Sequence, residues 1–451
     1  MPELDRFATS LGLPVFSAPR AGVPLLEIEL LLDAGGERNP PHRPGLSAMT
    51  ASMIDEGTAR RTGPELSAEL ERRGGALSCQ ADWNAARLRL QLLSADLDYG
   101  LTLLAELLFT PVFPPHELER LRQQTLAELK RRADQPAALA DQAFAHHLYS
   151  GSIFAHPLAG TAVALDAMRH DELLDFHREL YRLDHGALVV AGDFDRGALA
   201  VAVERAFSAG AAGAAGSRRP GSTSTAHAPG LARPGAPEPR NGSRRIVVVD
   251  RPGADQTELR IGHLGVPRRH PDRVGLGILN TLLGGKFTSR INLNLRERHG
   301  FTYGASSRFV DRKGTGPFVI SAAVTTAATG RATQEVLGEL QRIRQEPVSP
   351  LELDETRNYL LGVFPYGLQT VEGLSARLDE IALYDLPLDT PARYLAEIGG
   401  IRPGEIQRLA QSHLWPERAL VVAVGPAEEL MRQLQELGEP ELWRPLATTS
   451  S

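Results

Sequence analysis

The chain has a single cysteine, Cys79, among its 451 residues. One cysteine cannot form an intrachain disulfide, and it cannot supply the several thiolates of a cysteine-based metal site. Cys79 lies in a strand-like pattern, and we interpret it as a small buried residue. The sequence therefore excludes a disulfide-stabilised scaffold and a cysteine-based metal centre.

Long apolar runs and a positive net charge are also missing. No apolar run approaches the ~20 residues of a membrane-spanning helix, and residues 1–5 lack the basic and then apolar pattern of an export signal. The formal net charge of −6 argues against a nucleic-acid partner, which would require a basic face. We therefore expect a soluble protein of the cytoplasm, with the periplasm as the alternative compartment, that has no membrane span and does not bind nucleic acid.

What the chain does contain predicts packed domains. Its length and its hydrophobic content of 42% are typical of about two to three globular domains. Residues 208–243 consist mainly of Ala, Gly, Pro, Ser, Thr and Arg, with Leu231 as the only large aliphatic residue. Such a segment cannot bury a core, so we predict a flexible linker there. The linker separates an N-terminal domain, residues 1–207, from a C-terminal domain, residues 244–451.

The two predicted domains contain repeated sequence. The segment Ala187–Ala191 reads Ala-Leu-Val-Val-Ala and recurs at Ala419–Ala423, near the end of the second half. Gly45-Leu46, at the start of the first long helix, is echoed by Gly275-Leu276 at nearly the same offset. The two matches indicate an internal duplication. Strands mixed with helices predict two homologous α+β domains, each a mostly antiparallel sheet packed against helices.

The segment 295–304 is the most informative stretch of the second half. It ends a predicted helix, Phe287–Arg298, and continues beyond Gly300 into an aromatic-rich extended segment. Arg296 carries five hydrogen-bond donors on a planar cation, and Tyr303 carries a phenol. Such a pair can hold a peptide backbone or a developing oxyanion. The alternative is structural, with Arg296 at a helix C-terminus and Tyr303 packed in a strand.

Six segments together carry a resemblance to a known family. They are Leu32–Glu37, Pro44–Met53, Glu56–Thr58, Ala155–Thr161, Val189–Asp193 and Leu295–Gly304. In this order they resemble the short, two-domain members of the pitrilysin/insulinase metallopeptidase clan, which includes the mitochondrial processing peptidase and related bacterial zinc peptidases. The resemblance covers nearly the whole chain outside the predicted linker. It implies two homologous α+β domains that form half of a clamshell.

The resemblance also shows which catalytic residues are missing. Active members of the clan carry the motif His-x-x-Glu-His after Gly-Leu; its histidines bind zinc, and its glutamate activates the zinc-bound water. The matching positions here are Ala48, Ala51 and Ser52. Glu128 lies about where a distant carboxylate completes the site in active members. One carboxylate without its histidine partners does not make a zinc site, so we interpret Glu128 as a surface or inter-helix residue.

No other catalytic pattern replaces the missing motif. His146 and His147 are adjacent on a predicted helix, so their side chains diverge by about 100°. The histidines at positions 263, 270 and 299 have no Glu or His at i+4. No zinc-binding His-Glu-x-x-His, Gly-x-Ser-x-Gly or phosphate-loop pattern is present. We therefore expect neither a metal nor catalytic residues in this chain alone.

The resemblance gives Arg296 and Tyr303 a role in substrate binding. In the clan the domain facing the zinc supplies an Arg/Tyr pair, and some members divide the two tasks between subunits. Arg296 and Tyr303 match the spacing of that pair, whereas Arg298 is out of register by two. The resemblance implies that the Tyr303 hydroxyl donates to the carbonyl under attack or its neighbour. Arg296 would then hold a nearby backbone carbonyl.

The sequence thus predicts a non-catalytic subunit of a heterodimeric zinc metalloendopeptidase, with zinc in a homologous partner and an unfolded peptide as substrate. One alternative is a structural scaffold, as in the core subunits of respiratory complexes with this fold. Another is an independent enzyme with an unrecognised zinc site. The substrate subunit of the mitochondrial processing peptidase has a long glycine-rich loop where this chain has Gly284-Gly285. That difference favours a bacterial general peptidase.

Overall fold

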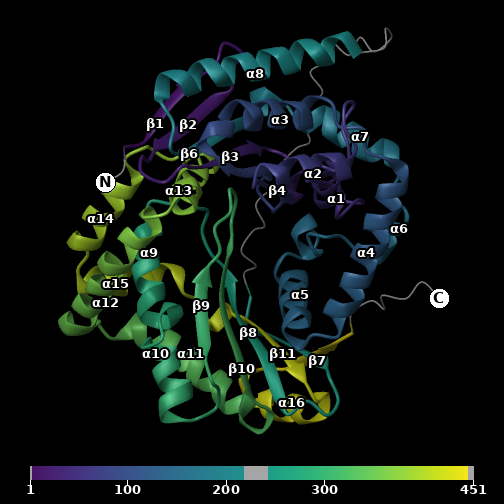
Figure 1. Ribbon diagram of the computed structural model, residues 1–451. Coiled ribbons are helices and arrows are strands. Elements are labelled where there is room, and N and C mark those ends of the chain that lie inside the picture. The colour runs from purple at the N-terminus through teal and green to yellow at the C-terminus, as the bar shows by residue number, and fades with distance from the viewer. Residues whose placement is uncertain (1–2, 218–241, 445–451) are drawn as a thin grey trace.

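The computed structural model describes residues 3–217 and 242–444. Two six-stranded sheets, each with helices packed against it, lie one above the other in Figure 1. Among the described residues, seven of the ten pairings between neighbouring strands are antiparallel, which confirms the predicted fold class. Within the described residues, none of the helices combines the length and the apolar character that crossing a bilayer requires.

The first sheet is built from strands in the first half of the chain. Its strands are β1 (Asp5–Ala8), β2 (Pro14–Pro19), β3 (Leu25–Leu32), β4 (Ala76–Ala81), β5 (Ala86–Leu93) and β6 (Gly186–Gly192). Their order across the sheet is β1-β2-β6-β3-β5-β4. Only β2 and β6 are parallel. Strand β4 is at one edge of this sheet.

The first half contains eight described α-helices, all but one of which, α5, belong to the domain of this sheet. They are α1 (Leu46–Met53), α2 (Gly63–Arg72), α3 (Leu97–Phe109), α4 (Pro115–Ala133), α5 (Pro136–Leu148), α6 (Ala162–Asp166), α7 (His170–Leu180) and α8 (Arg196–Ser217). Helix α2 begins with a capping box: Thr62 accepts from the backbone of Glu65, and the Glu65 carboxylate accepts from the backbone of Thr62. Helix α8 extends to Ser217, so it includes the first residues of the segment predicted as a linker. Residues 218–241 of that segment lie outside the described residues.

The second sheet repeats the first in five strands, and the sixth differs, because β1 is antiparallel to β2 whereas β12, from the end of the chain, is parallel to β7. Its strands are β7 (Arg245–Asp250), β8 (Gln256–Leu264), β9 (Ala305–Phe309), β10 (Pro317–Thr325), β11 (Leu420–Gly425) and β12 (Pro440–Trp443). Their order is β12-β7-β11-β8-β10-β9. The two repeated Leu-Val-Val segments are β6 and β11, each third in its sheet. This equivalence confirms that the chain contains two homologous domains.

The helices of the second half are more irregular near the candidate site. They are α9 (Arg273–Asn280), α10 (Arg290–Asn292), α11 (Thr329–Gln345), α12 (Pro350–Val363), α13 (Val371–Leu383), α14 (Thr390–Gly400), α15 (Pro403–His413) and α16 (Ala427–Leu434). Wider π-type turns continue α9 through Thr281–Gly285 and α10 through Leu293–Arg298. The predicted helix 287–298 is therefore a short α-helical turn followed by a π-helical segment. Such π-segments occur frequently at functional sites.

The two halves exchange one helix each. Helix α13 comes from the second half and packs on β2, β3 and β6 of the first sheet, while α5 comes from the first half and packs on β8 and β11 (Figure 1). The first contact joins Leu374 and Leu378 to Phe16 and Val189, and all four side chains are buried. The second contact buries α5 against the valines of β7 and β11. Each sheet is therefore buried on both faces, and the halves share hydrophobic cores.

A charged network lies where α13 crosses the first sheet. Glu29 on β3 is fully buried and pairs with Arg89 (Nη2–Oε2 2.7 Å) and Arg87 (Nε–Oε1 3.2 Å). Arg87 also donates two hydrogen bonds to Asp379 on α13, at 3.0 and 3.2 Å. Burial, together with the neighbouring Asp379 carboxylate, raises the pKa of Glu29 to about 8, although both arginines oppose this shift. Folding therefore raises the pKa of Glu29 above its usual range.

This network gives a prediction about pH. Because the pKa of Glu29 is raised by folding, its contribution to stability is present at low pH and is lost as pH rises toward about 8. We expect Glu29→Gln, which cannot ionise, to remove this loss, worth roughly 2 kcal/mol between about pH 6 and pH 8. Urea unfolding across that range measures the effect, with the exposed Glu71→Gln as the matched control. Parallel pH profiles for Glu29→Gln and the wild type would contradict the prediction.

Candidate functional site

The positions of the missing zinc motif lie on α1, which packs against β4 and α4. Ala51 is fully buried, Ala48 is half-buried and Ser52 is exposed. A methyl group cannot ligate a metal, and a lone serine hydroxyl does not replace two imidazoles. Glu128, on α4, is 39% exposed and pairs with Arg131 (Nη2–Oε1 2.6 Å) and Arg132 (Nε–Oε1 2.8 Å). These hydrogen bonds lower the pKa of Glu128 to about 2, so its carboxylate is engaged by neighbouring arginines.

The segment that carries Arg296 and Tyr303 begins with a well-defined helix end. The backbone N–H of Gly300 donates to the carbonyl of Arg296 (3.1 Å), and that of Phe301 donates to the carbonyl of Leu295 (2.8 Å). Gly300 has φ of +65°, the left-handed conformation that terminates many helices and that glycine adopts without strain. The glycine that breaks the helical pattern in the sequence is therefore a helix C-terminal residue.

Tyr303 lies in a loop between two buried anchors. Phe301 and Ala305 are 9% and 7% exposed, whereas the Tyr303 side chain is 92% exposed. The buried Asn292 holds the end of this loop, because its Oδ1 accepts from the Ala305 N–H (2.9 Å) and its Nδ2 donates to the Ala305 carbonyl (2.6 Å). The loop thus holds the phenol outward. The alternative in which Tyr303 packs in a strand is wrong, since β9 begins at Ala305 and Tyr303 is exposed.

Arg296 lies at the surface beside an exposed aromatic ring. Its guanidinium carbon is 3.5 Å from the centroid of the Phe287 ring, and its Nε donates to Glu297 Oε1 at 2.8 Å. Its side chain is 20% exposed. Among the described residues, its side-chain hydrogen bonds go to Glu297, and no helix carbonyl is a partner. Arg296 is therefore held by stacking and by a solvent-facing ion pair that a ligand can replace.

A groove of about 450 Å³ lies next to these two residues. Phe287 and Tyr359 line it, with Lys286, Gly304, Ser306 and Ser321 among the other lining residues. Phe287 is 68% exposed and Tyr359 is 44% exposed, so two aromatic rings face solvent at the groove. Phe287 connects the groove to Arg296, and Gly304 connects it to Tyr303. The groove can therefore accept a large apolar group close to both candidate residues.

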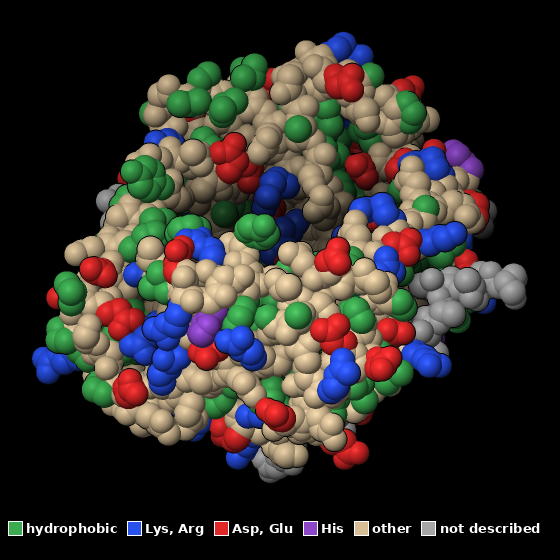
Figure 2. Space-filling model, turned by 90° about the horizontal axis from the view of Figure 1, so that it is seen from below, with side chains coloured by type: hydrophobic (Ala, Val, Ile, Leu, Met, Phe, Trp, Pro, Cys, Tyr) green, Lys and Arg blue, Asp and Glu red, His purple; other side chains and the backbone are tan. Residues whose placement is uncertain are grey.

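Strand β9 is the edge strand beside the groove. It is the last strand of the second sheet, and its only strand partner in the described part of the chain is β10. Its outer edge is covered, because Asn292 binds both backbone groups of Ala305, Arg273 donates to the Phe309 carbonyl at 3.3 Å, and the turn Thr281–Gly285 packs along the strand. Figure 2, which shows the underside of the molecule, shows a hollow with Lys and Arg side chains inside it and hydrophobic side chains at its rim.

Sequence reasoning located Arg296 and Tyr303 but missed their supporting residues. Asn292, Phe287 and Tyr359 had no recognisable pattern, because each acts through a contact made only in three dimensions. An exposed aromatic such as Phe287, near a helix start, resembles an ordinary surface residue in the sequence. The Gly284-Gly285 pair offered one signal, since close backbone packing requires glycine. A Cβ on Gly284 would lie 2.5 Å from Ser307 Oγ.

Two family models match the chain. The model described as "Insulinase (Peptidase family M16)" matches residues 20–162, and "Peptidase M16 inactive domain" matches residues 167–360. An uncharacterized zinc protease of Streptomyces coelicolor is 22% identical over 401 residues, which cover 88% of this chain and 83% of that protein.

Two solved structures resemble the chain along nearly its whole length. The peptidase M16 inactive domain from Pseudomonas fluorescens has a TM-score of 0.84 and 23% identity, covering 94% of this chain and 98% of that one. A chain in the structure of complex III2 from Candida albicans has a TM-score of 0.76 and 15% identity, covering 97% and 100%. At these identities the structural likeness shows a shared fold alone.

Proposed function

Because the chain belongs to the M16 (insulinase) peptidase family, and because Ala48, Ala51 and Ser52 occupy the zinc positions, we propose that it is a non-catalytic peptidase subunit. It binds peptide substrate and completes the active site of a homologous, zinc-bearing partner through Arg296 and Tyr303. The observation that carries this proposal is the outward-facing Tyr303 beside Arg296 and an apolar groove, in a chain with Ala48, Ala51 and Ser52 at the positions of the zinc motif. The two subunits would form the halves of a clamshell.

The proposal assigns binding and electrostatic tasks to this chain. Zinc bound in the partner would supply an activated water and polarise the scissile carbonyl. The Tyr303 hydroxyl donates a hydrogen bond to the oxygen on which negative charge develops, and this donor is most effective when water is excluded by closure of the two halves. Arg296 donates to a neighbouring backbone carbonyl of the substrate. Moving the Arg296 guanidinium from Glu297 to the substrate costs little, because surface ion pairs are worth about 0–1 kcal/mol.

The groove supports binding of an unfolded peptide through one of its side chains. Phe287 and Tyr359, which line the groove and are exposed, would contact an apolar side chain of that peptide. The proposed substrate is therefore an unfolded polypeptide with a large apolar residue near the cleaved bond.

A reconstitution experiment tests the proposal. The zinc-bearing homologue that carries His-x-x-Glu-His is purified by itself and with this chain, and cleavage of an unstructured peptide is measured. We expect little activity from either chain alone and at least about a 100-fold higher rate from the pair. Full activity of the zinc-bearing chain alone would contradict the proposal.

The fold shared with the complex III2 chain supports a second candidate, a structural scaffold. Under this hypothesis Arg296 and Tyr303 have no chemical role. Stable co-purification with a membrane complex, without peptide cleavage, would favour the scaffold. Co-purification with a zinc-motif chain that gains activity from it would favour the peptidase subunit.

A further inference from the structure

Two histidines and one aspartate meet in the second domain, away from the positions of the missing zinc motif. His270 precedes α9, Asp272 is the residue before α9 begins, and His413 is the last residue of α15. One ligand atom from each of the three lies within 4.8 Å of the others. We propose that His270, Asp272 and His413 form a binding site for a divalent transition-metal ion, and that zinc is its ion.

The donor atoms suit zinc in number and kind. Two imidazole nitrogens and one carboxylate oxygen are three of the four ligands in common zinc sites, and water takes the fourth position. Ligand atoms around tetrahedral zinc lie roughly 3.4 Å apart, so small side-chain rotations bring these three into range. The nitrogen and oxygen donors also favour zinc over magnesium or calcium, which prefer oxygen ligands alone.

The surrounding contacts orient the three side chains. His413 Nε2 is 2.7 Å from Asp272 Oδ2, and Arg408 Nη2 donates to the other oxygen, Oδ1, at 3.0 Å. The backbone N–H of Asp272 donates to His270 Nδ1 at 3.1 Å, so Nδ1 presents a lone pair that an ion would use in place of this hydrogen bond. The imidazole centroids of His270 and His413 are 5.2 Å apart. Arg408 holds Oδ1 of the carboxylate, as outer-shell partners of metal ligands do, and the ion would replace the proton that His413 Nε2 shares with Oδ2.

The burial of the cluster allows an ion to enter and still shields the site. The Asp272 and His413 side chains are 24% and 11% exposed, and His270 is half-buried. Without a metal, the same residues form a hydrogen-bonded contact between α9 and α15, which pack together. With a metal, two helices distant in the sequence are cross-linked by coordination. None of the three residues lines the groove beside Tyr303, so the ion site is separate from the proposed peptidase site.

Zinc titration of the chelator-treated full chain, followed by calorimetry, tests this inference. We expect one zinc per chain, and we expect His270→Ala and His413→Ala each to weaken binding at least about tenfold. His116→Ala is the matched control, because its side chain is 79% exposed and lies outside the cluster. The control should bind zinc as the wild type does.

A second measurement covers the case in which a variant does not fold. Cobalt(II) added to the wild-type chain should give the absorption bands of nitrogen- and oxygen-ligated cobalt, and zinc should raise the melting temperature of the wild type. No zinc binding by the wild type, or equal binding by folded His270→Ala and His413→Ala variants, would overturn the inference. Neither outcome depends on peptide cleavage, so the metal site and the proposed peptidase role fail or succeed separately.

Discussion

Tyr303→Phe should lower the rate of peptide cleavage by the reconstituted pair roughly 100-fold, because it removes one donor to the developing oxyanion. The change deletes a single oxygen from a side chain that is 92% exposed. The loss should appear in kcat, with KM nearly unchanged, since the hydrogen bond strengthens as charge develops in the transition state. Steady-state kinetics over a range of peptide concentrations separates the two constants.

The control for this prediction is an equivalent change elsewhere on the surface. Tyr366 is 69% exposed, and Tyr366→Phe should leave kcat and KM unchanged. Both variants should melt at the wild-type temperature, because neither hydroxyl contributes to the core. If the reconstituted subunits keep the wild-type kcat when this chain carries Tyr303→Phe, the phenol has no chemical role. That result would favour the scaffold hypothesis.

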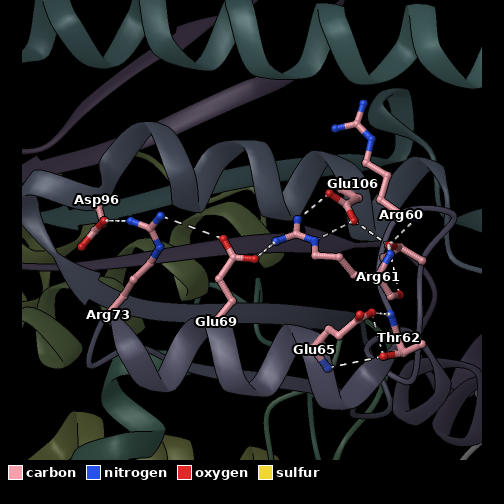
Figure 3. A network of polar contacts seen from close by, with 9 residues as sticks. Arg60, Arg61, Thr62, Glu65, Glu69, Arg73, Asp96 and Glu106 are labelled. Atoms are coloured by element: carbon pink, nitrogen blue, oxygen red, sulfur yellow. Dashed lines mark hydrogen bonds and ion pairs between the residues drawn. The ribbon is translucent and has the colours of Figure 1, made fainter.

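Arg61→Ala should destabilise the first domain by about 3–5 kcal/mol, the cost of leaving a buried carboxylate unpaired. Figure 3 shows Arg61 between two carboxylates that join α2 to α3. Its Nη2 and Nε contact the two oxygens of Glu106 at 2.5 and 3.2 Å, and its Nη1 contacts Glu69 at 2.5 Å. The Glu106 side chain is only 4% exposed. Although burial raises the pKa of Glu106, hydrogen bonds from Arg61 and Thr58 outweigh it and lower that pKa.

Urea unfolding measures this loss. Arg131→Ala is the control, because its ion pair with Glu128 lies on the surface and should contribute less than about 1 kcal/mol. Replacing both Arg61 and Glu106 by methionine should recover much of the stability, since no charge is then left buried without a partner. If Arg61→Ala lowers the free energy of unfolding no more than Arg131→Ala does, Glu106 is not effectively desolvated.

Much of the fold could be predicted from local sequence patterns. The alternation in β5 and the capping box at Thr62 each reflect contacts between near neighbours, so the pattern is visible in the sequence. The repeated Leu-Val-Val segments correctly indicated two homologous domains. The short edge strands β1 and β12 were missed, because neither has a strong apolar pattern of its own.

The metal cluster illustrates a limit of sequence reasoning. His270 and Asp272 are close in the chain, but His413 comes from a helix near the other end of the domain. A search for histidine or glutamate at helical spacing examines one helix at a time. It cannot detect ligands that two helices contribute jointly, so His270 appeared isolated in the sequence.

The exchange of α5 and α13 was also not predictable. Both helices have an apolar face, and their patterns show that the face is buried but not which sheet covers it. The buried Glu29 gave a hint, because a charged residue in the middle of an apolar strand requires partners. Those partners include Asp379, which lies on a helix of the other half.

The sequence by itself determined the two homologous α+β domains, and it predicted Ala48, Ala51 and Ser52 at the positions of the zinc motif and Arg296 and Tyr303 as substrate-binding residues. These features depend on residue identity and short spacing, which a linear chain preserves. Only the tertiary structure decided that Tyr303 faces solvent and that Arg296 stacks on Phe287. It also decided that each half covers the sheet of the other. Such features arise from packing between residues far apart in the chain, and local patterns do not encode which distant surfaces meet.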